Sequence, residues 1–211
     1  MLQFTVIPVT PLSQNSTLIW DDETSDAILT DVGGDIEVLL EAINHYQVNL
    51  RGIWLTHGHF DHVGGVADLC KTHNVPVLGP NEEDIFLLDK LPQIAAQYGM
   101  SAGKFMPTRF LQDNDCLSVG KYEFCVLHIP GHTPGSVVYY CEEAKLLIAG
   151  DVLFLESIGR SDFPRSDGEA LLNGIRNKIF VLPDDIRVVT GHGALTTVGH
   201  EKRCNPFFLN Q

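Results

Sequence analysis

The chain has 211 residues, of which 44% are hydrophobic and 19% charged, and this balance predicts one globular domain over residues 1–211. Its net charge of −13 and its lack of a basic stretch argue against nucleic-acid binding, which needs cations for phosphates. No apolar run reaches the roughly eighteen residues of a membrane span, and no basic segment opens a signal peptide. We therefore expect a cytoplasmic protein without a membrane role.

Strands and helices are predicted in turn along the first part of the chain. Alternating or short apolar runs predict strands, and apolar positions at helical spacing predict helices. The expected order is three strands, a helix, a strand and a helix, at residues 2–9, 16–20, 26–30, 36–46, 51–56 and 66–73. The second and third strands are separated by a polar turn, which predicts a hairpin.

The second part of the chain repeats this kind of layout. A short strand at 75–79 precedes a helix at 81–90, and the mixed stretch 91–112 is a candidate lid. Three strands, a helix, a strand and a short C-terminal helix follow, with the first five at 121–130, 136–143, 145–151, 167–182 and 186–191. Asn81 and Asp167 are expected to cap the helices that they precede. Two such halves predict two sheets with helices outside them.

The five cysteines are scattered and none belongs to a CxxC pair, so neither a disulfide framework nor a cysteine zinc site is indicated. Histidine and aspartate are grouped instead. The stretch THGHFDHVGG at 56–65 follows a predicted strand, and three later strands also end at a His or Asp. If these four strand ends converge, seven candidate metal ligands meet: His57, His59, Asp61, His62, His132, Asp151 and His192.

Imidazole and carboxylate ligands without thiolate suit Zn²⁺, Fe or Mn. A catalytic ion takes about three protein ligands and keeps an open position. Seven ligands therefore predict two divalent metal ions that share a carboxylate, with Zn²⁺ as the favoured metal. The remaining histidines are interpreted as ordinary residues: His45, His73 and His200 at the surface, and His128 in a structural role beside His132.

The stretches THGHFDHVGG, GHTPGS (131–136), GDVLF (150–154) and GHG (191–193) together resemble the metallo-β-lactamase superfamily. The resemblance implies an α+β fold, a four-layer αββα sandwich with the metal site at one edge of the sheets. It implies that His57, His59 and His132 hold one ion, that Asp61, His62 and His192 hold the second, and that Asp151 bridges them. Position 59 is His, whereas the diiron flavoprotein branch has an acidic residue there.

Within that superfamily the chain is similar to glyoxalase II, the hydroxyacylglutathione hydrolases, particularly the short bacterial branch. The similarity is carried by SIGRSDFPRSD at 157–167, and a related loop occurs in persulfide dioxygenases. It implies a small-molecule thioester substrate, a glutathione conjugate, with Arg160, Phe163 and Arg165 as candidate substrate contacts. Lys104 and Arg109 are further candidates for binding a substrate carboxylate.

The residues predict hydrolysis by water activated between two metals, with Asp61 as the catalytic carboxylate. A thiolate leaving group, with a pKa of about 8.5, needs no dedicated general acid. The similarity to glyoxalase II implies that the favoured reaction is conversion of S-D-lactoylglutathione to D-lactate and glutathione. The alternatives are a mononuclear Fe(II) persulfide dioxygenase using His57, His132 and Asp151, a lactonase or other esterase, and a non-catalytic metal-binding module.

Overall fold

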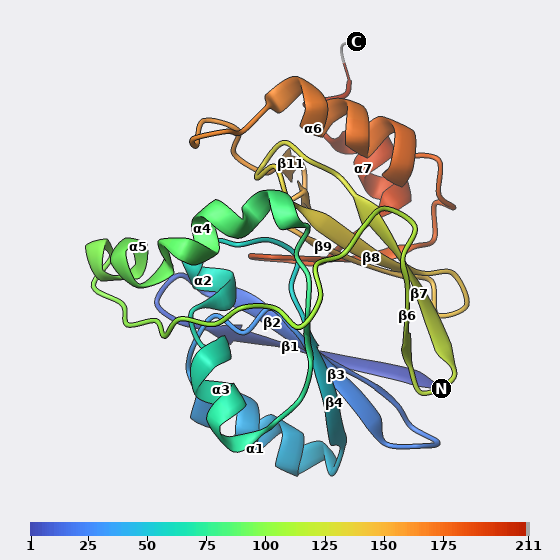
Figure 1. Cartoon of the computed structure of the whole chain (residues 1–211). Coiled ribbons are helices and arrows are strands. Elements are labelled where there is room, and N and C mark those ends of the chain that lie inside the picture. The colour runs from blue at the N-terminus through green and yellow to red at the C-terminus, as the bar shows by residue number, and fades with distance from the viewer. Residues whose placement is uncertain (210–211) are drawn as a thin grey trace.

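Two β-sheets lie face to face between two layers of helices in the computed structural model, which describes residues 1–209 (Figure 1). The first sheet has five strands in sequence order: β1 (Leu2–Val9), β2 (Gln14–Asp21), β3 (Asp26–Thr30), β4 (Asn49–Trp54) and β5 (Val77–Leu78). β1, β2 and β3 are antiparallel neighbours, whereas β3, β4 and β5 run parallel.

The second sheet has six strands in the order β13-β12-β9-β8-β7-β6. Their bounds are β6 (Cys116–Val119), β7 (Tyr122–His128), β8 (Val137–Cys141), β9 (Leu146–Gly150), β12 (Arg187–Thr190) and β13 (Thr196–Thr197). Only the β9–β12 pair in this sheet is parallel. A separate hairpin, β10 (Leu153–Phe154) with β11 (Ser157–Ile158), follows β9.

The helices cover the outer faces of the two sheets (Figure 1). On the first sheet lie α1 (Ile36–Tyr46) and α3 (Val66–Thr72), and on the second lie α6 (Gly168–Gly174), its π-helical continuation Ile175–Ile179 and α7 (Val198–Cys204). Near the sheet edge lie α2 (Phe60–Val63), the 3-10 turn Glu82–Asp84, α4 (Ile85–Asp89) and α5 (Leu91–Gln97). Among the described residues, no helix is long and apolar enough to cross a bilayer.

The alternation of side chains along the strands builds three apolar layers. In β2, Leu18 packs toward α1 and α3, whereas its neighbour Ile19 packs between the sheets. In β9, Ile148 lies between the sheets, whereas Leu147 packs toward α6 and α7. The predicted αββα sandwich of the α+β class is therefore confirmed.

Most of the predicted elements are present, with changed ends. The helix expected at 81–90 starts as a 3-10 turn, where Asn81 accepts a hydrogen bond from the Glu83 amide, and continues as α4. The helix expected at 167–182 is capped by Asp167, which accepts from the Ala170 amide, and becomes π-helical at Ile175. The stretch 91–112 contains α5 and then irregular chain. The strands β6, β10, β11 and β13 were not predicted.

Candidate metal centre

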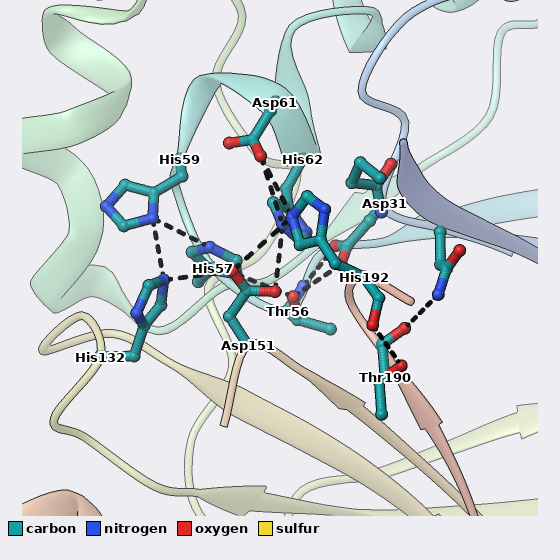
Figure 2. Close-up of polar contacts among 12 residues, drawn as sticks. Asp31, Thr56, His57, His59, Asp61, His62, His132, Asp151, Thr190 and His192 are labelled. Atoms are coloured by element: carbon teal, nitrogen blue, oxygen red, sulfur yellow. Dashed lines mark hydrogen bonds and ion pairs between the residues drawn. The ribbon is translucent and has the colours of Figure 1, made fainter. Parts of the chain in front are cut away.

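The predicted side chains come together at one edge of the sandwich, where several strands end (Figure 2). His57 follows β4, and α2 with the residue before it carries His59, Asp61 and His62. The other three come from the second sheet: His132 from the β7–β8 loop, Asp151 from the end of β9 and His192 from the end of β12. Because β4 and β9 each end at this edge, both sheets contribute to one site.

Three imidazole nitrogens converge in a first cluster, formed by His57, His59 and His132. His59 Nδ1 lies 3.1 Å from His57 Nε2 and 3.0 Å from His132 Nε2. Two nitrogens bound to one tetrahedral zinc, each at about 2.0–2.1 Å, lie about 3.4 Å apart. The spacing in this cluster is close to that expected for three ligands of one ion.

A second cluster contains Asp61, His62 and His192. His192 Nε2 lies 3.3 Å from Asp61 Oδ2 and 3.3 Å from His62 Nε2, and His62 Nε2 lies 3.9 Å from Asp61 Oδ2. The donor set of two imidazoles and one carboxylate again suits a borderline divalent metal.

Asp151 lies between the two clusters. One of its oxygens, Oδ1, is 3.3 Å from His62 Nε2 in the second cluster, and the other, Oδ2, is 3.5 Å from His132 Nε2 in the first. Oδ1 is buried and makes no hydrogen bond of acceptable geometry with the described residues. A buried carboxylate oxygen without a hydrogen bond is costly unless something else satisfies it. This orphaned atom fits a carboxylate placed to bridge two cations.

Four of the histidine rings are oriented by a hydrogen bond from the nitrogen that faces away from the centre. His132 Nδ1 donates to the Arg160 carbonyl at 2.9 Å, and His192 Nδ1 donates to the Leu12 carbonyl at 3.1 Å. Because a carbonyl can only accept, Nδ1 carries the proton in both rings. The Nε2 lone pair of each ring is then available to a metal.

The other two rings are held by Asp31, which lies at the end of β3. His62 Nδ1 donates to Asp31 Oδ2 at 2.9 Å. The Thr56 hydroxyl donates to the same oxygen at 2.6 Å and therefore accepts from His57 Nδ1 at 3.0 Å. Asp31 also accepts the Thr56 amide at 2.7 Å. One buried carboxylate thus orients one histidine of each cluster (Figure 2).

The two clusters differ in the direction of their pKa shifts. Burial lowers the pKa of His57 well below its usual value, and burial with the nearby His132 lowers the pKa of His59 to about 3. Burial acts in the same direction on His62, but the carboxylates of Asp151 and Asp61 outweigh it and raise its pKa well above the usual value. The pKa of His192 is raised too, because the hydrogen bond to Asp61 and the charges of Asp151 and Asp61 together outweigh burial.

Both carboxylates of the centre favour the ionised form. Burial alone would raise the pKa of Asp151 and of Asp61, but at each residue the charge of His62 and the interactions with the other nearby histidines together outweigh it. The pKa of Asp151 therefore lies well below its usual range, and that of Asp61 is lowered. Ionised carboxylates with imidazole lone pairs form a donor set that fits two divalent ions.

Asp84 is a second carboxylate that the sequence did not single out. It accepts from the Gly58 amide at 2.8 Å, from the Thr133 hydroxyl at 2.8 Å and from the Gly135 amide at 2.7 Å. These donors flank His57, His59 and His132, so Asp84 ties together the two loops of the first cluster. In the sequence, Asp84 could have been noticed as an aspartate at the start of a predicted helix. Asp31 could have been noticed as a polar residue at the end of a predicted strand.

A cavity of about 1040 Å³ lies over the centre. Of the predicted substrate contacts, Arg160 and Phe163 line it. Arg165 lies outside the lining, where its guanidinium binds Glu83 at 2.7 Å and stacks on Phe86. Apolar side chains form most of the wall: Leu12, Phe60, Phe86, Leu87, Ile94, Tyr98, Phe154, Leu155, Ile158, Phe163, Pro164 and Ala194.

The remaining candidates lie away from the cavity. Lys104 and Arg109 are both exposed and line no part of it, and Arg109 approaches Asp115 at 3.9 Å. His128 donates through Nε2 to the Pro134 carbonyl at 2.8 Å, which steadies the loop carrying His132 and supports the structural role predicted for it. All five cysteines are free.

Known proteins resemble the chain over nearly its whole length. The sequence model of the metallo-beta-lactamase superfamily matches residues 9–192. Hydroxyacylglutathione hydrolase GloC of Haemophilus influenzae is 46% identical over 204 residues, which are 96% of this chain and 96% of that protein.

Two solved structures share the arrangement of the sheets and helices. BLEG-1 B3 metallo-beta-lactamase superposes with a TM-score of 0.90 at 38% identity, covering 99% of this chain and 100% of the other. TTHA1623 in a di-iron-bound form superposes with a TM-score of 0.88 at 36% identity, covering 96% and 99%. The second of these carries two metal ions.

Proposed function

The chain belongs to the metallo-beta-lactamase superfamily, and on that basis we propose that it is a dinuclear hydrolase of glutathione thioesters. The preferred substrate in this proposal is S-D-lactoylglutathione, which reacts with water to give D-lactate and glutathione. The observation that carries the proposal is the pair of three-residue clusters with Asp151 between them. The similarity to a hydroxyacylglutathione hydrolase supports the choice of substrate.

In this proposal one ion would be held by His57, His59 and His132. The other would be held by Asp61, His62 and His192, and Asp151 would be available to both. When bound, a pair of divalent cations supplies Lewis acidity, which lowers the pKa of water to about 7 and neutralises charge on a carbonyl oxygen. Zn²⁺ is the proposed metal, and Fe and Mn suit the same donors. The di-iron form of a structural relative supports two ions in this arrangement.

The protein side chains orient the reactants. Asp61 accepts a proton from the attacking water, and the water oxygen forms a bond to the thioester carbonyl carbon. The C–S bond then breaks, and the electron pair leaves with sulfur as a thiolate. Because the conjugate thiol has a pKa of about 8.5, the thiolate leaves without a general acid. The apolar wall, with Phe163 beside His59 at a ring-centroid distance of 5.0 Å, limits the access of bulk water.

The decisive experiment measures hydrolysis of S-D-lactoylglutathione by purified protein and the metal content of the same sample. We expect rapid loss of the thioester, and we expect a chelator to abolish it. Two bound metals without turnover would reject glutathione thioesters and favour lactones or other esters. One iron per chain with oxygen consumption would instead indicate the persulfide dioxygenase.

A further inference from the structure

The cavity over the metal centre differs in charge from the rest of the molecule. The chain has a net charge of −13, yet among residues 1–209 only two charged side chains line the cavity besides the candidate metal ligands, and both are cations. They are Lys90 and Arg160. In the part of the chain that the structure describes, Asp61 and Asp151 are the acidic residues of its lining. An otherwise apolar cavity with two cations fits an anionic ligand.

The two cations are not equally available. The Arg160 guanidinium binds Asp162 through Nε and Nη2, both at 3.0 Å, and lies 4.5 Å over the Phe163 ring. Its charge is thereby balanced within its own loop. Within residues 1–209, the lysines whose ammonium groups form ion pairs or hydrogen bonds are Lys71, Lys121, Lys145, Lys178 and Lys202. Lys90 is exposed and is not among them. Lys90 is therefore the unpaired cation of the cavity.

Lys90 also has a fixed place in the fold. It is the single residue between α4 and α5, and it serves as the C-cap of the first and the N-cap of the second. Its amide donates to the Leu87 carbonyl at 3.2 Å, which fixes the backbone from which the side chain extends. The neighbouring wall residues from these helices, Phe86, Leu87, Ile94 and Gln97, carry no charge.

We propose that Lys90 anchors a carboxylate of the thiol part of the substrate and so selects anionic thioesters over neutral ones. This inference rests on the proposed hydrolase activity and adds a specificity-determining residue to it. The acyl carbon would lie at the metal centre, and the carboxylate would extend to the wall formed by α4 and α5. Because an ammonium group gains from a charged acceptor but not from a neutral thioester, its contribution depends on substrate charge.

The test compares Lys90→Gln with Lys104→Gln, a control at another exposed lysine that lies outside the cavity. Each is assayed with S-D-lactoylglutathione and with S-D-lactoyl-N-acetylcysteamine, a neutral thioester of the same acyl group. For Lys90→Gln we expect KM for the glutathione thioester to rise about tenfold, with kcat unchanged. Values for the neutral thioester should equal wild type, and Lys90→Arg should restore KM. Lys104→Gln should match wild type on both.

An equal loss on both thioesters would overturn the proposal, because it would indicate a structural effect of position 90. Unchanged KM for the glutathione thioester would also overturn it while leaving the hydrolase activity in place. Wild-type protein that hydrolyses neither compound would reject the proposed function itself, and with it this role of Lys90. Metal content measured on each variant shows whether the centre is intact.

Discussion

Asp61 is the residue of the centre with the most direct predicted role in turnover. Its Oδ2 lies 3.3 Å from His192 Nε2, and its side chain is 13% exposed, so it both joins the second cluster and borders the cavity. We expect Asp61→Ala to lower kcat by at least about a hundredfold, because a metal ligand and the proton acceptor are lost together. Asp68→Asn, at an exposed position on α3, is the matched control. Undiminished turnover in Asp61→Ala would rule out the role assigned to it.

The opposite pKa shifts of the two clusters predict that their metals respond differently to pH. Raised pKa values mean that His62 and His192 bind protons at a pH where an ordinary histidine is neutral, so protons compete with metal there. Lowered pKa values keep His57 and His59 unprotonated to lower pH. We therefore expect the second cluster to lose its metal first as the pH falls from about 8 to about 5. Metal analysis after dialysis checks this, and loss of both metals in one step would contradict it.

At the residue level the sequence located the side chains that converge, but not those that support them. Three histidines and an aspartate within residues 57–62 rarely occur without a metal, so their chemistry alone identified the region. Metal binding itself stays a prediction. Asp31 and Asp84 act through hydrogen bonds to residues 25 or more positions away, such as Thr56 and Gly135. A single aspartate at a strand end or helix start has no local pattern that distinguishes this role.

The loop that carries His57 and His59 and the loop that carries His132 depend on Asp84 for their relative position. Asp84→Asn replaces one accepting oxygen by an NH₂ group, which faces donors from Gly58, Thr133 or Gly135. Because each buried unpaired donor costs about 1–3 kcal/mol, we expect unfolding free energy to fall by about 3 kcal/mol and metal affinity to fall with it. The control is Asp89→Asn, at an exposed aspartate of α4 that forms no ion pair with the residues that the structure describes.

Chemical denaturation with metal analysis of both variants checks this expectation. A destabilisation of Asp89→Asn equal to that of Asp84→Asn would show that the loop contacts are not the cause. Retained metal affinity in Asp84→Asn would show that the two loops keep their positions without it.

At the level of elements, the helices and strands that the sequence predicted are the longer ones with a clear apolar period. The long periodic helix α1 and the apolar strands β7, β8 and β9 were predicted because burial imposes a clear period on them. β6 was missed although its residues alternate between exposed and buried, since Cys116 and Ser118 gave a short and weakly apolar pattern. The strands β10, β11 and β13 are only two residues long, which is too short for a periodic pattern to appear, although each pairs with a strand close to it in the chain.

Across the whole molecule the candidate ligands join the two sheets. Anything that binds only the folded state stabilises it, by about 4 kcal/mol when its concentration is a thousand times its dissociation constant. For a chain of this size 1 kcal/mol corresponds to about 2–4 °C in Tm. We therefore expect a chelator to lower Tm by on the order of 10 °C and added zinc to restore it, as followed by calorimetry. A Tm independent of metal would show that the sandwich does not rely on the centre.

The wide spacing of the candidate ligands along the chain also bears on biosynthesis. A ribosome delivers His57, His59, Asp61 and His62 early, together with the first sheet, whereas Asp151 and His192 arrive only with β9 and β12. Until β12 pairs with β9, the second cluster lacks one imidazole. Capture of the second metal ion is therefore expected at the end of folding, after synthesis of β12. The cellular metal supply would then govern the maturation of nearly folded chains and not the start of their folding.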